Sequence, residues 1–357
     1  MAQRTASTVD PTQIQSPAQI PPPGARFAGL SFQGQVEVYN GTLSGDVDAL
    51  PATQELLATY PGTGGLGNAD AIYNQVSKLY GGIQLPAFQS PQGNSIKSLV
   101  FVSGSAQGGY GAFHMEGQSQ ADFDRIVTDS LTASGNYSAS SGLPRALKPL
   151  PVKPHLWAPN HEAAKLGLTS PKTAQGRHYL STALFAAELV ESFELLTATA
   201  DAGATDGEAM SRVIAFKLAP EISLLPGFNA GVTQQWWQDG RPDWVNNNSQ
   251  NDQSMDGNAA GVMFLFFLND YLGVPLQAVI AHMPKSSGAP LGQTYVNCLK
   301  DFPGIVQTAG KDGFSAFQAM VKLLEGIAQG PKGPLNLPSN GNPFLAMVGS
   351  KPGGLFS

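Results

Sequence analysis

Four glutamates in the middle of the chain have a spacing that could support acid–base chemistry. Glu188, Glu191 and Glu194 recur every three residues in a helix-like stretch, and Glu208 follows in the sequence DGEAMSR. The three-residue spacing places the first three along one slowly drifting face of a helix. Two carboxylates in one cleft can act as general acid and general base when burial keeps one of them protonated. The candidate catalytic residues are therefore Glu188, Glu191 and Glu208.

Glu208 also has a purely structural interpretation. Thr205 and Glu208 have the S/T-x-x-E spacing of a capping box, in which each side chain accepts a hydrogen bond from the other residue's backbone amide at a helix start. The glutamate series likewise matches an ordinary solvated helix face. The sequence leaves the catalytic and the structural interpretation of these carboxylates open.

The string AELVE at residues 187–191 occupies the frame of an HExxH zinc motif. In that motif two histidines one helical turn apart bind zinc, and the glutamate between them is the general base. With Glu208 on the next predicted helix, the layout resembles that of gluzincin metallopeptidases, in which a later helix supplies a glutamate as the third metal ligand. The resemblance implies a zincin-like fold. Because Ala187 and Glu191 stand where the histidines would be, it implies a degenerate metallopeptidase without the usual zinc site.

Three longer motifs carry a second resemblance. They are DGEAMSR at 206–212, RPDWVN at 241–246 and GNAAGVMFLFFLNDYLG at 257–273. As a set they are similar to the NGEGLSR, RPDFVN and GCAxLFLxYLxxQLG motifs of an uncharacterised bacterial family. The chain departs from that family at Ala209, where glycine is usual, and at Ala259, where cysteine is frequent. The resemblance implies relatives of the same fold and assigns no chemistry.

An aromatic cluster in the sequence QQWWQDGRPDW is the candidate ligand-binding site. Its residues are Trp236, Trp237, Arg241 and Trp244. Aromatic faces beside polar groups can stack on sugar rings or anchor a protein partner. The alternative is that the tryptophans cover the apolar helix that follows, while Arg241 pairs with Asp243 or with a buried glutamate.

The polar segment NNNSQNDQSMDGN at 246–258 contains the candidate metal ligands. Asp252, Ser254 and Asp256 alternate along the chain and precede Gly257, like the first half of a calcium-binding loop. The closing acid of such a loop is missing. The alternative is an exposed loop in which Asp256 serves as N-cap of the next helix. Calcium is the only candidate cofactor.

The predicted elements place these candidates in a helical second half. Strand-like runs in the N-terminal part surround one predicted helix at 69–80, which Gly81 and Gly82 should end. After a proline-rich bridge the apolar spacing becomes helical, with predicted helices at 179–196, 207–218, 258–272, 276–283 and 313–329. The helix at 258–272 is apolar nearly all round and should be the most buried, and Asp312 should cap the last helix. The predicted fold class is α+β, with a mainly β N-terminal half packed on a mainly helical, zincin-like C-terminal half.

The same pattern predicts four segments along the chain. An extended proline-rich arm spans 1–24, a mixed β-rich subdomain spans 25–150, and a helical zincin-like subdomain spans 151–330. A tail rich in Pro, Gly and Asn spans 331–357. The tail should lack regular structure and dock through its apolar residues Phe344, Leu345 and Met347.

Composition limits the classes of function. Charged residues make up 13% of the chain and the net charge is −6, with no long basic run, so we expect no nucleic-acid or anionic-membrane partner. Cys298 is the single cysteine, which excludes an internal disulfide. We find no apolar run long enough to cross a bilayer and no Sec-type pattern at the N-terminus. We expect a soluble protein, and the uncharged polar composition also suits export by a route without a Sec signal.

Two hypotheses about function follow. The first is a non-catalytic binding or structural protein on a degenerate zincin-like scaffold, either exported or part of an assembly, with a protein or polymer partner. The second is a carboxylate-dependent hydrolase that acts on a glycan or peptide polymer, with the tryptophan cluster supplying sugar stacking. The sequence does not decide whether the chain is an enzyme.

Overall fold

The computed structural model describes the chain in thirteen stretches. They are residues 25–30, 35–41, 69–89, 95–103, 112–113, 155–157, 174–201, 203–218, 230–249, 254–285, 288–330, 333–338 and 341–356. The chain forms two compact units, of which the first comprises Met1–Val76 and Gln84–Ser192 and the second comprises Ser77–Ile83 and Phe193–Ser357. We call them unit 1 and unit 2. The predicted arm at 1–24 lies outside the described residues, so the predicted segment boundaries stay predictions.

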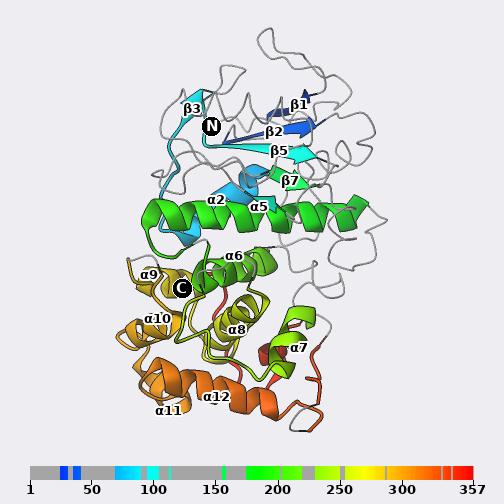
Figure 1. Cartoon of the computed structure of the whole chain (residues 1–357). Helices are drawn as coiled ribbons and strands as arrows, with labels where there is room; N and C mark the ends of the chain where they lie inside the picture. The colour runs from blue at the N-terminus through cyan, green and yellow to red at the C-terminus, as the bar shows by residue number, and fades with distance from the viewer. Residues whose placement is uncertain are drawn as a thin grey trace. The chain divides into compact units, whose positions relative to one another are not determined.

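Unit 1 contains a mixed five-stranded sheet with the order β1-β2-β5-β7-β6 (Figure 1). The strands are β1 (Ala25–Leu30), β2 (Val36–Gly41), β5 (Ser98–Ser103), β6 (Ala112–Phe113) and β7 (His155–Trp157). The central pairs β2–β5 and β5–β7 are parallel, and both outer pairs are antiparallel. A separate two-stranded ladder joins β3 (Phe88–Gln89) to β4 (Ser95–Ile96).

Helix α2 (Ala69–Leu79) lies between β2 and β5 in the sequence. Its carboxylate Asp70 accepts hydrogen bonds from the amides of Gln35 (2.9 Å) and Val36 (3.0 Å), which ties the first turn of the helix to the start of β2. Gly81 and Gly82 both have positive φ and close the last turn, as glycines after a helix commonly do. The predicted helix and its glycine stop are confirmed.

The predicted α+β fold class is wrong. Helices, among them the 24-residue α5 (Ala174–Thr197), account for most of the described residues, and within 25–150 the described strands are short and separated by α2. The sequence β2, α2, β5 with parallel pairing is a crossover connection, typical of α/β structure rather than of segregated α+β structure. Alternating residues identify single strands but carry no information on parallel pairing across a helix. The resemblance of the C-terminal half to zincins stays a prediction.

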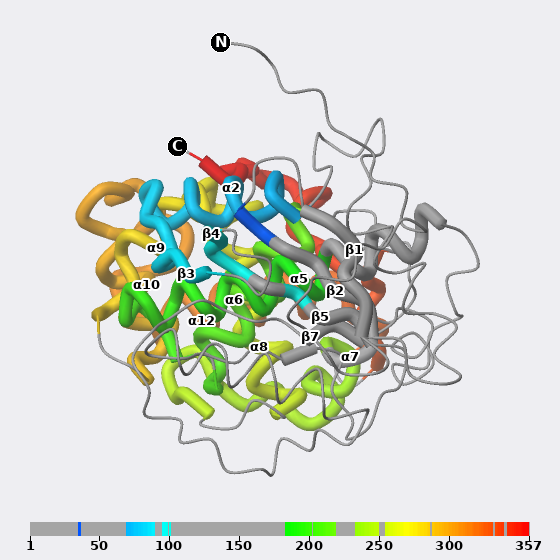
Figure 2. Tube along the Cα trace, turned by 90° about the horizontal axis from the view of Figure 1, so that it is seen from above, coloured from blue at the N-terminus to red at the C-terminus, as the bar shows by residue number. Residues whose placement is uncertain are grey.

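Unit 2 is built from helices around α8. Its elements are α6 (Thr205–Leu218), α7 (Ala230–Gln238), α8 (Met255–Phe266), the π-helix η2 (Phe267–Tyr271), α9 (Leu276–His282), α10 (Leu291–Cys298), the 3-10 turn η3 (Pro303–Ile305), α11 (Val306–Ala309), α12 (Gly313–Glu325) and the 3-10 turn η4 (Pro343–Ala346). Both α6 and α7 pack against α8, and α9 lies beside α10 (Figure 1 and Figure 2). All residues from Gly257 to Asp270 are buried. This confirms the prediction that the apolar helix in this region is deeply buried.

Two glycines allow α8 to approach α6 closely. A Cβ atom added to Gly261 would lie 2.5 Å from the Cβ of Ala209, and one added to Gly257 would lie 2.7 Å from the hydroxyl of Thr205. No real pair of atoms tolerates such distances without a shift of the helices. The small residues of the DGEAMSR and GNAAG motifs are therefore explained by packing.

Helix α12 and the tail match the predicted pattern in part, because α12 ends at Glu325 and the tail, predicted to lack regular structure, contains the 3-10 turn η4. Asp312 caps α12 by accepting a hydrogen bond from the amide of Ser315 at 2.7 Å. Phe314 in the first turn of α12 is 62% exposed, whereas Phe317 is buried. In the tail, Phe344 is buried while Leu345 is exposed, so Phe344 is the docking side chain. No helix within the described ranges is long and apolar enough to cross a membrane.

Candidate functional site

A buried polar network of unit 2 lies where α8 passes into η2. Asn269 and Asp270 end the apolar run GVMFLFFL, and the side chains of both are fully buried. In η2 the amide of Leu272 donates to the carbonyl of Phe267 at 2.9 Å, one residue farther than in an α-helix. Such π-turns insert one extra residue and occur frequently at functional sites.

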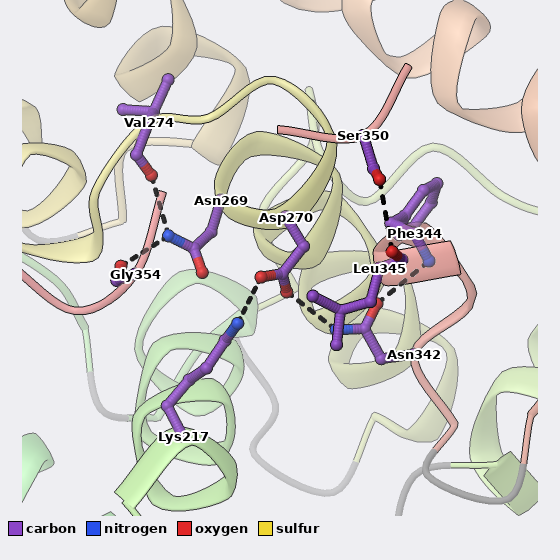
Figure 3. A network of polar contacts seen from close by, with 9 residues as sticks. All are labelled: Lys217, Asn269, Asp270, Val274, Asn342, Phe344, Leu345, Ser350 and Gly354. Atoms are coloured by element: carbon purple, nitrogen blue, oxygen red, sulfur yellow. Dashed lines mark hydrogen bonds and ion pairs between the residues drawn. The ribbon is translucent and has the colours of Figure 1, made fainter. Parts of the chain in front are cut away.

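Asp270 binds one group with each carboxylate oxygen (Figure 3). Its Oδ1 contacts Nζ of Lys217, which comes from α6, and its Oδ2 accepts a hydrogen bond of 2.8 Å from Nδ2 of Asn342 in the tail. A buried carboxylate is costly unless it has both a counter-charge and hydrogen-bond donors. Asp270 has both, and it thereby joins three segments that are far apart in the sequence.

Asn342 uses both ends of its carboxamide. While its Nδ2 donates to Asp270, its Oδ1 accepts a hydrogen bond of 3.1 Å from the backbone amide of Phe344. The side chain thus caps η4 and is fully buried at 1% exposure. These two partners fix which end of the carboxamide faces the carboxylate.

Asn269 attaches the end of the tail to the same turn. Its Nδ2 donates to the carbonyl oxygens of Val274 (2.9 Å) and Gly354 (2.7 Å), and its backbone carbonyl accepts from the amide of Gly353 at 2.7 Å. A Cβ atom at Gly353 would lie 2.7 Å from the carbonyl carbon of Val274, so glycine is needed for this approach. The tail therefore closes the network on two sides.

Aromatic rings pack against one another on the elements that carry these polar groups. Phe216, the neighbour of Lys217, packs edge-on against Phe266 at 5.1 Å between ring centroids, and Phe267 packs against Phe344 at 5.8 Å. Only 15% of the Lys217 side chain is exposed, and none of the Asp270 side chain is. The site combines an amine, a carboxylate and a carboxamide in an apolar enclosure, a set of groups that can exchange protons and form an amide.

The predicted catalytic glutamates fall in different units. Glu188 and Glu191 are buried on α5 in unit 1, whereas Glu208 belongs to α6 in unit 2. The Oε2 atom of Glu208 lies 3.5 Å from the guanidinium of Arg212, one turn later on the same helix. No common cleft for these carboxylates follows from the described residues, and their catalytic role stays a prediction.

The alternative capping box at Thr205 is not formed. The hydroxyl of Thr205 accepts from the amide of Ser249 at 3.1 Å, and the amide of Thr205 donates to the carbonyl of Ser249 at 3.0 Å. The amide of Glu208 donates to the carbonyl of Ala204. A partner 44 residues later in the chain has thus replaced the local partner, which sequence spacing could not indicate.

Asp206, which the sequence did not single out, fastens the loop before Ser249 to the start of α6. Its Oδ1 accepts from Nδ2 of Asn248 at 2.7 Å, its Oδ2 accepts from the amide of Asp201 at 3.3 Å, and its own amide donates to Asn248 Oδ1 at 3.2 Å. Burial raises the pKa of Asp206 to about 6, and the nearby charge of Asp201 adds to the rise. In the sequence, the signal that could have identified Asp206 is its place in TDGE at the start of a helix.

The RPDWVN motif forms a turn held by Asp243. Its Oδ1 accepts from the amides of Val245 (3.0 Å) and Asn246 (2.9 Å), and its Oδ2 accepts from Nδ2 of Asn246 at 2.8 Å. The Oδ1 atom of Asn246 occupies the space where a Cβ of Gly292 or Gly313 would lie, at the starts of α10 and α12. The motif therefore organises the contact between these two helices.

The tryptophan cluster lies largely inside unit 2. Trp236 is fully buried and its indole donates to the carbonyl of Pro242 (3.1 Å), while the buried Trp237 donates to the carbonyl of Gly333 (3.0 Å). Arg241 stacks on the Trp237 ring and pairs with Glu325 at 3.1 Å, so its acidic partner is an exposed glutamate and neither Asp243 nor the buried glutamate that was expected. Trp244, next to Asp243, is half-buried. A ligand-binding role for these residues stays a prediction.

The candidate calcium ligands are only partly described. Asp252 lies outside the described residues, and Ser254 is the N-cap of α8, accepting from the amide of Gly257 at 3.2 Å. The predicted N-cap role of Asp256 is therefore wrong, and Asp256 belongs to the first helical turn. Burial and the charge of Asp239 raise the pKa of Asp256. Among the residues that the structure describes, no group of three or more His, Cys, Asp or Glu side chains could hold a metal, and calcium stays a prediction.

The motifs behind the two sequence resemblances mostly lie in unit 2. DGEAMSR starts α6, RPDWVN forms the turn after α7, and the apolar motif forms α8 and η2. Their glycines and polar residues contact one another or the helices beside them, which explains their spacing by packing. Comparison of the chain with protein-family models, with curated proteins and with solved structures finds no match.

Proposed function

We propose that the chain is a non-catalytic binding or structural protein whose helical unit serves as a rigid scaffold. One observation carries the proposal: the motif aspartates Asp206, Asp243 and Asp270 each have both carboxylate oxygens bonded inside unit 2. A catalytic carboxylate must present an oxygen to substrate or water. These three instead hold loops, helix starts and the tail in place.

The candidate glutamates add support to this proposal. Glu208 has an arginine neighbour on its own helix, and Glu188 and Glu191 are buried on another element. A hydrolase would require two of these carboxylates to meet at a substrate with one of them protonated. The partner of such a scaffold would be a protein or a polymer that binds without being cleaved.

The test compares turnover by the wild type with that of matched variants. Purified full-length chain is incubated with fluorescently labelled peptide and glycan polymers, with and without a chelator, beside Glu188→Gln and Glu208→Gln. Glu325→Gln on α12 is the control, because Glu325 also pairs with an arginine and is more exposed than Glu208. We expect no turnover above a boiled sample in any of the four proteins.

A specific result would overturn the proposal. If the wild type and Glu325→Gln cleave a polymer, and Glu188→Gln or Glu208→Gln loses that activity while keeping its circular dichroism spectrum, the chain is a carboxylate-dependent hydrolase. An amide cannot replace the carboxylate as acid or base.

A further inference from the structure

We infer that Lys217 and Asn342 form an intramolecular isopeptide bond, with Asp270 as the proton carrier of the reaction. The bond would join Nζ of Lys217 to Cγ of Asn342 and release ammonia. It would link α6 covalently to the C-terminal tail. The inference is independent of the proposed function, because it concerns the chain's own maturation.

The first argument is position. One carboxylate, Asp270, contacts the lysine amine through Oδ1 and the asparagine carboxamide through Oδ2 at 2.8 Å. Nucleophile and acceptor are thereby held beside the same planar group (Figure 3). Holding two reactants in a fixed arrangement removes much of the entropic barrier to their reaction.

The second argument is the environment of the amine. Asp270 and Asn342 are essentially unexposed, and the neighbouring Phe216 and Phe344 are buried in ring contacts with Phe266 and Phe267. Transfer of a proton from Lys217 to Asp270 yields a neutral pair, and a neutral amine beside a base is an activated nucleophile. Exclusion of water also prevents competing hydrolysis.

The third argument is the hydrogen bond on the carboxamide oxygen. The backbone amide of Phe344 donates to Oδ1 of Asn342 at 3.1 Å. Attack on Cγ moves negative charge onto this oxygen, and a donor already aimed at it stabilises that charge, as in an oxyanion hole. The same hydrogen bond caps η4, so the structure of the tail holds the donor in place.

The atoms of the reaction balance. Asp270 takes a proton from the Lys217 ammonium, the neutral amine attacks Cγ of Asn342, and a tetrahedral intermediate forms with its oxyanion on Oδ1. Asp270 then donates a proton through Oδ2 to Nδ2, the bond from Cγ to Nδ2 breaks, and ammonia leaves. The proton remaining on the lysine nitrogen passes through Asp270 to the ammonia. Lysine ammonium and carboxamide have become a secondary amide and an ammonium ion, and no oxidant or cofactor is needed.

Mass spectrometry of the full chain tests the inference directly. The denatured wild-type protein should be lighter than the mass calculated from its sequence by one ammonia, after any N-terminal processing is accounted for by the fragment spectra. Proteolysis should yield a branched peptide in which Lys217 is joined to Asn342. Cleavage after Lys217 by trypsin should be absent.

Three variants separate the roles of the residues. Lys217→Arg keeps the positive charge but lacks the reactive amine, and Asn342→Ala lacks the acceptor, so both should have the full calculated mass. Asp270→Asn keeps amine and acceptor but removes the proton carrier, and it should also lack the branched peptide. Lys322→Arg changes an exposed lysine of α12 and should retain the link.

Either of two results on the wild type would overturn the inference, whether or not the variants fold. One is a full calculated mass with separate peptides for the two residues after prolonged incubation of the folded protein. The other is loss of one water with Lys217 joined to Asp270, because Asp270 would then be the acceptor and not the carrier.

Discussion

Two buried aspartates of unit 2 differ in whether their hydrogen-bonding partners include a positive charge. Asp206 at the start of α6 accepts only from neutral groups, the Asn248 carboxamide and a backbone amide, and it has an acidic neighbour in Asp201. Asp270 in η2 contacts the ammonium of Lys217 as well as the Asn342 carboxamide. Both side chains are about equally buried, so burial alone does not distinguish them.

The difference shows how the partner decides the effect of a buried acid. Burial without a counter-charge raises the pKa of Asp206 to about 6, so its ionised form weakens the folded state at neutral pH. For Asp270 the positive charge of Lys217 has the opposite effect on stability, because removing the carboxylate would leave a lysine unpaired in an apolar site. Replacing each acid by a neutral residue should therefore change stability in opposite directions.

The largest effect should come from Asp270→Ala. In chain that has not formed the Lys217–Asn342 link, we expect the free energy of unfolding at neutral pH to fall by about 3–5 kcal/mol, because one partner of a buried ion pair is removed. Urea unfolding followed by circular dichroism measures the change. Asp301→Ala is the control, since Asp301 pairs with His282 but its side chain is 67% exposed, and such pairs contribute less than about 1 kcal/mol. Equal losses in the two variants would show that Asp270 is not a buried, paired charge.

Asp206→Asn should have the opposite sign. The folded pKa of Asp206 is about 6 against an ordinary value of 3.8, so the folded protein binds a proton more tightly than the unfolded chain. Wild-type stability therefore falls as pH rises from 3.8 to about 6. The substitution should remove this fall, which amounts to about 3 kcal/mol at about 1.4 kcal/mol per pKa unit. Loss of the acceptor for the amide of Asp201 offsets part of that gain at pH 7.

Asp312→Asn is the matched control for this pH dependence. Hydrogen bonds from Ser315 lower the pKa of the exposed Asp312 carboxyl, so its contribution is present at neutral pH and is lost as pH falls through the folded pKa. Unfolding curves at a series of pH values should show the Asp206→Asn difference growing with pH up to about 6. If Asp206→Asn is less stable than the wild type at pH 7, its carboxylate is better satisfied than burial suggests.

Gly261→Ala should have the smallest effect of the three. Its new Cβ would lie 2.5 Å from that of Ala209, beside the turn that carries Asp206, and overpacking of this kind costs about 1–3 kcal/mol. Thermal or urea unfolding measures the loss, and Gly304→Ala is the control because nothing lies within 4 Å of its added Cβ. In the double variant Ala209→Gly/Gly261→Ala the clash should be relieved. A Gly261→Ala protein as stable as the control would mean that α6 and α8 can move apart freely.

Local sequence patterns determined several helices and their ends. The glycine pair after α2, the cap at Asp312 and the burial of α8 were all predicted, since each depends on residues within a few positions of one another. Propensity, capping and amphipathic spacing act over that range. The same local rules failed at Asp256, because Ser254 stands two residues earlier with an equally suitable oxygen.

Only the tertiary structure decided the partners of the polar residues. Lys217 meets Asp270 across 53 positions and Asn342 meets Asp270 across 72, whereas sequence reasoning concentrated on the evenly spaced glutamates. The parallel pairing of β2 with β5 was likewise invisible, because it depends on the path of a crossover helix. A buried charge selects whichever donor the packed helices bring to it, and that choice is made by the geometry of the whole unit and not by neighbours in the chain.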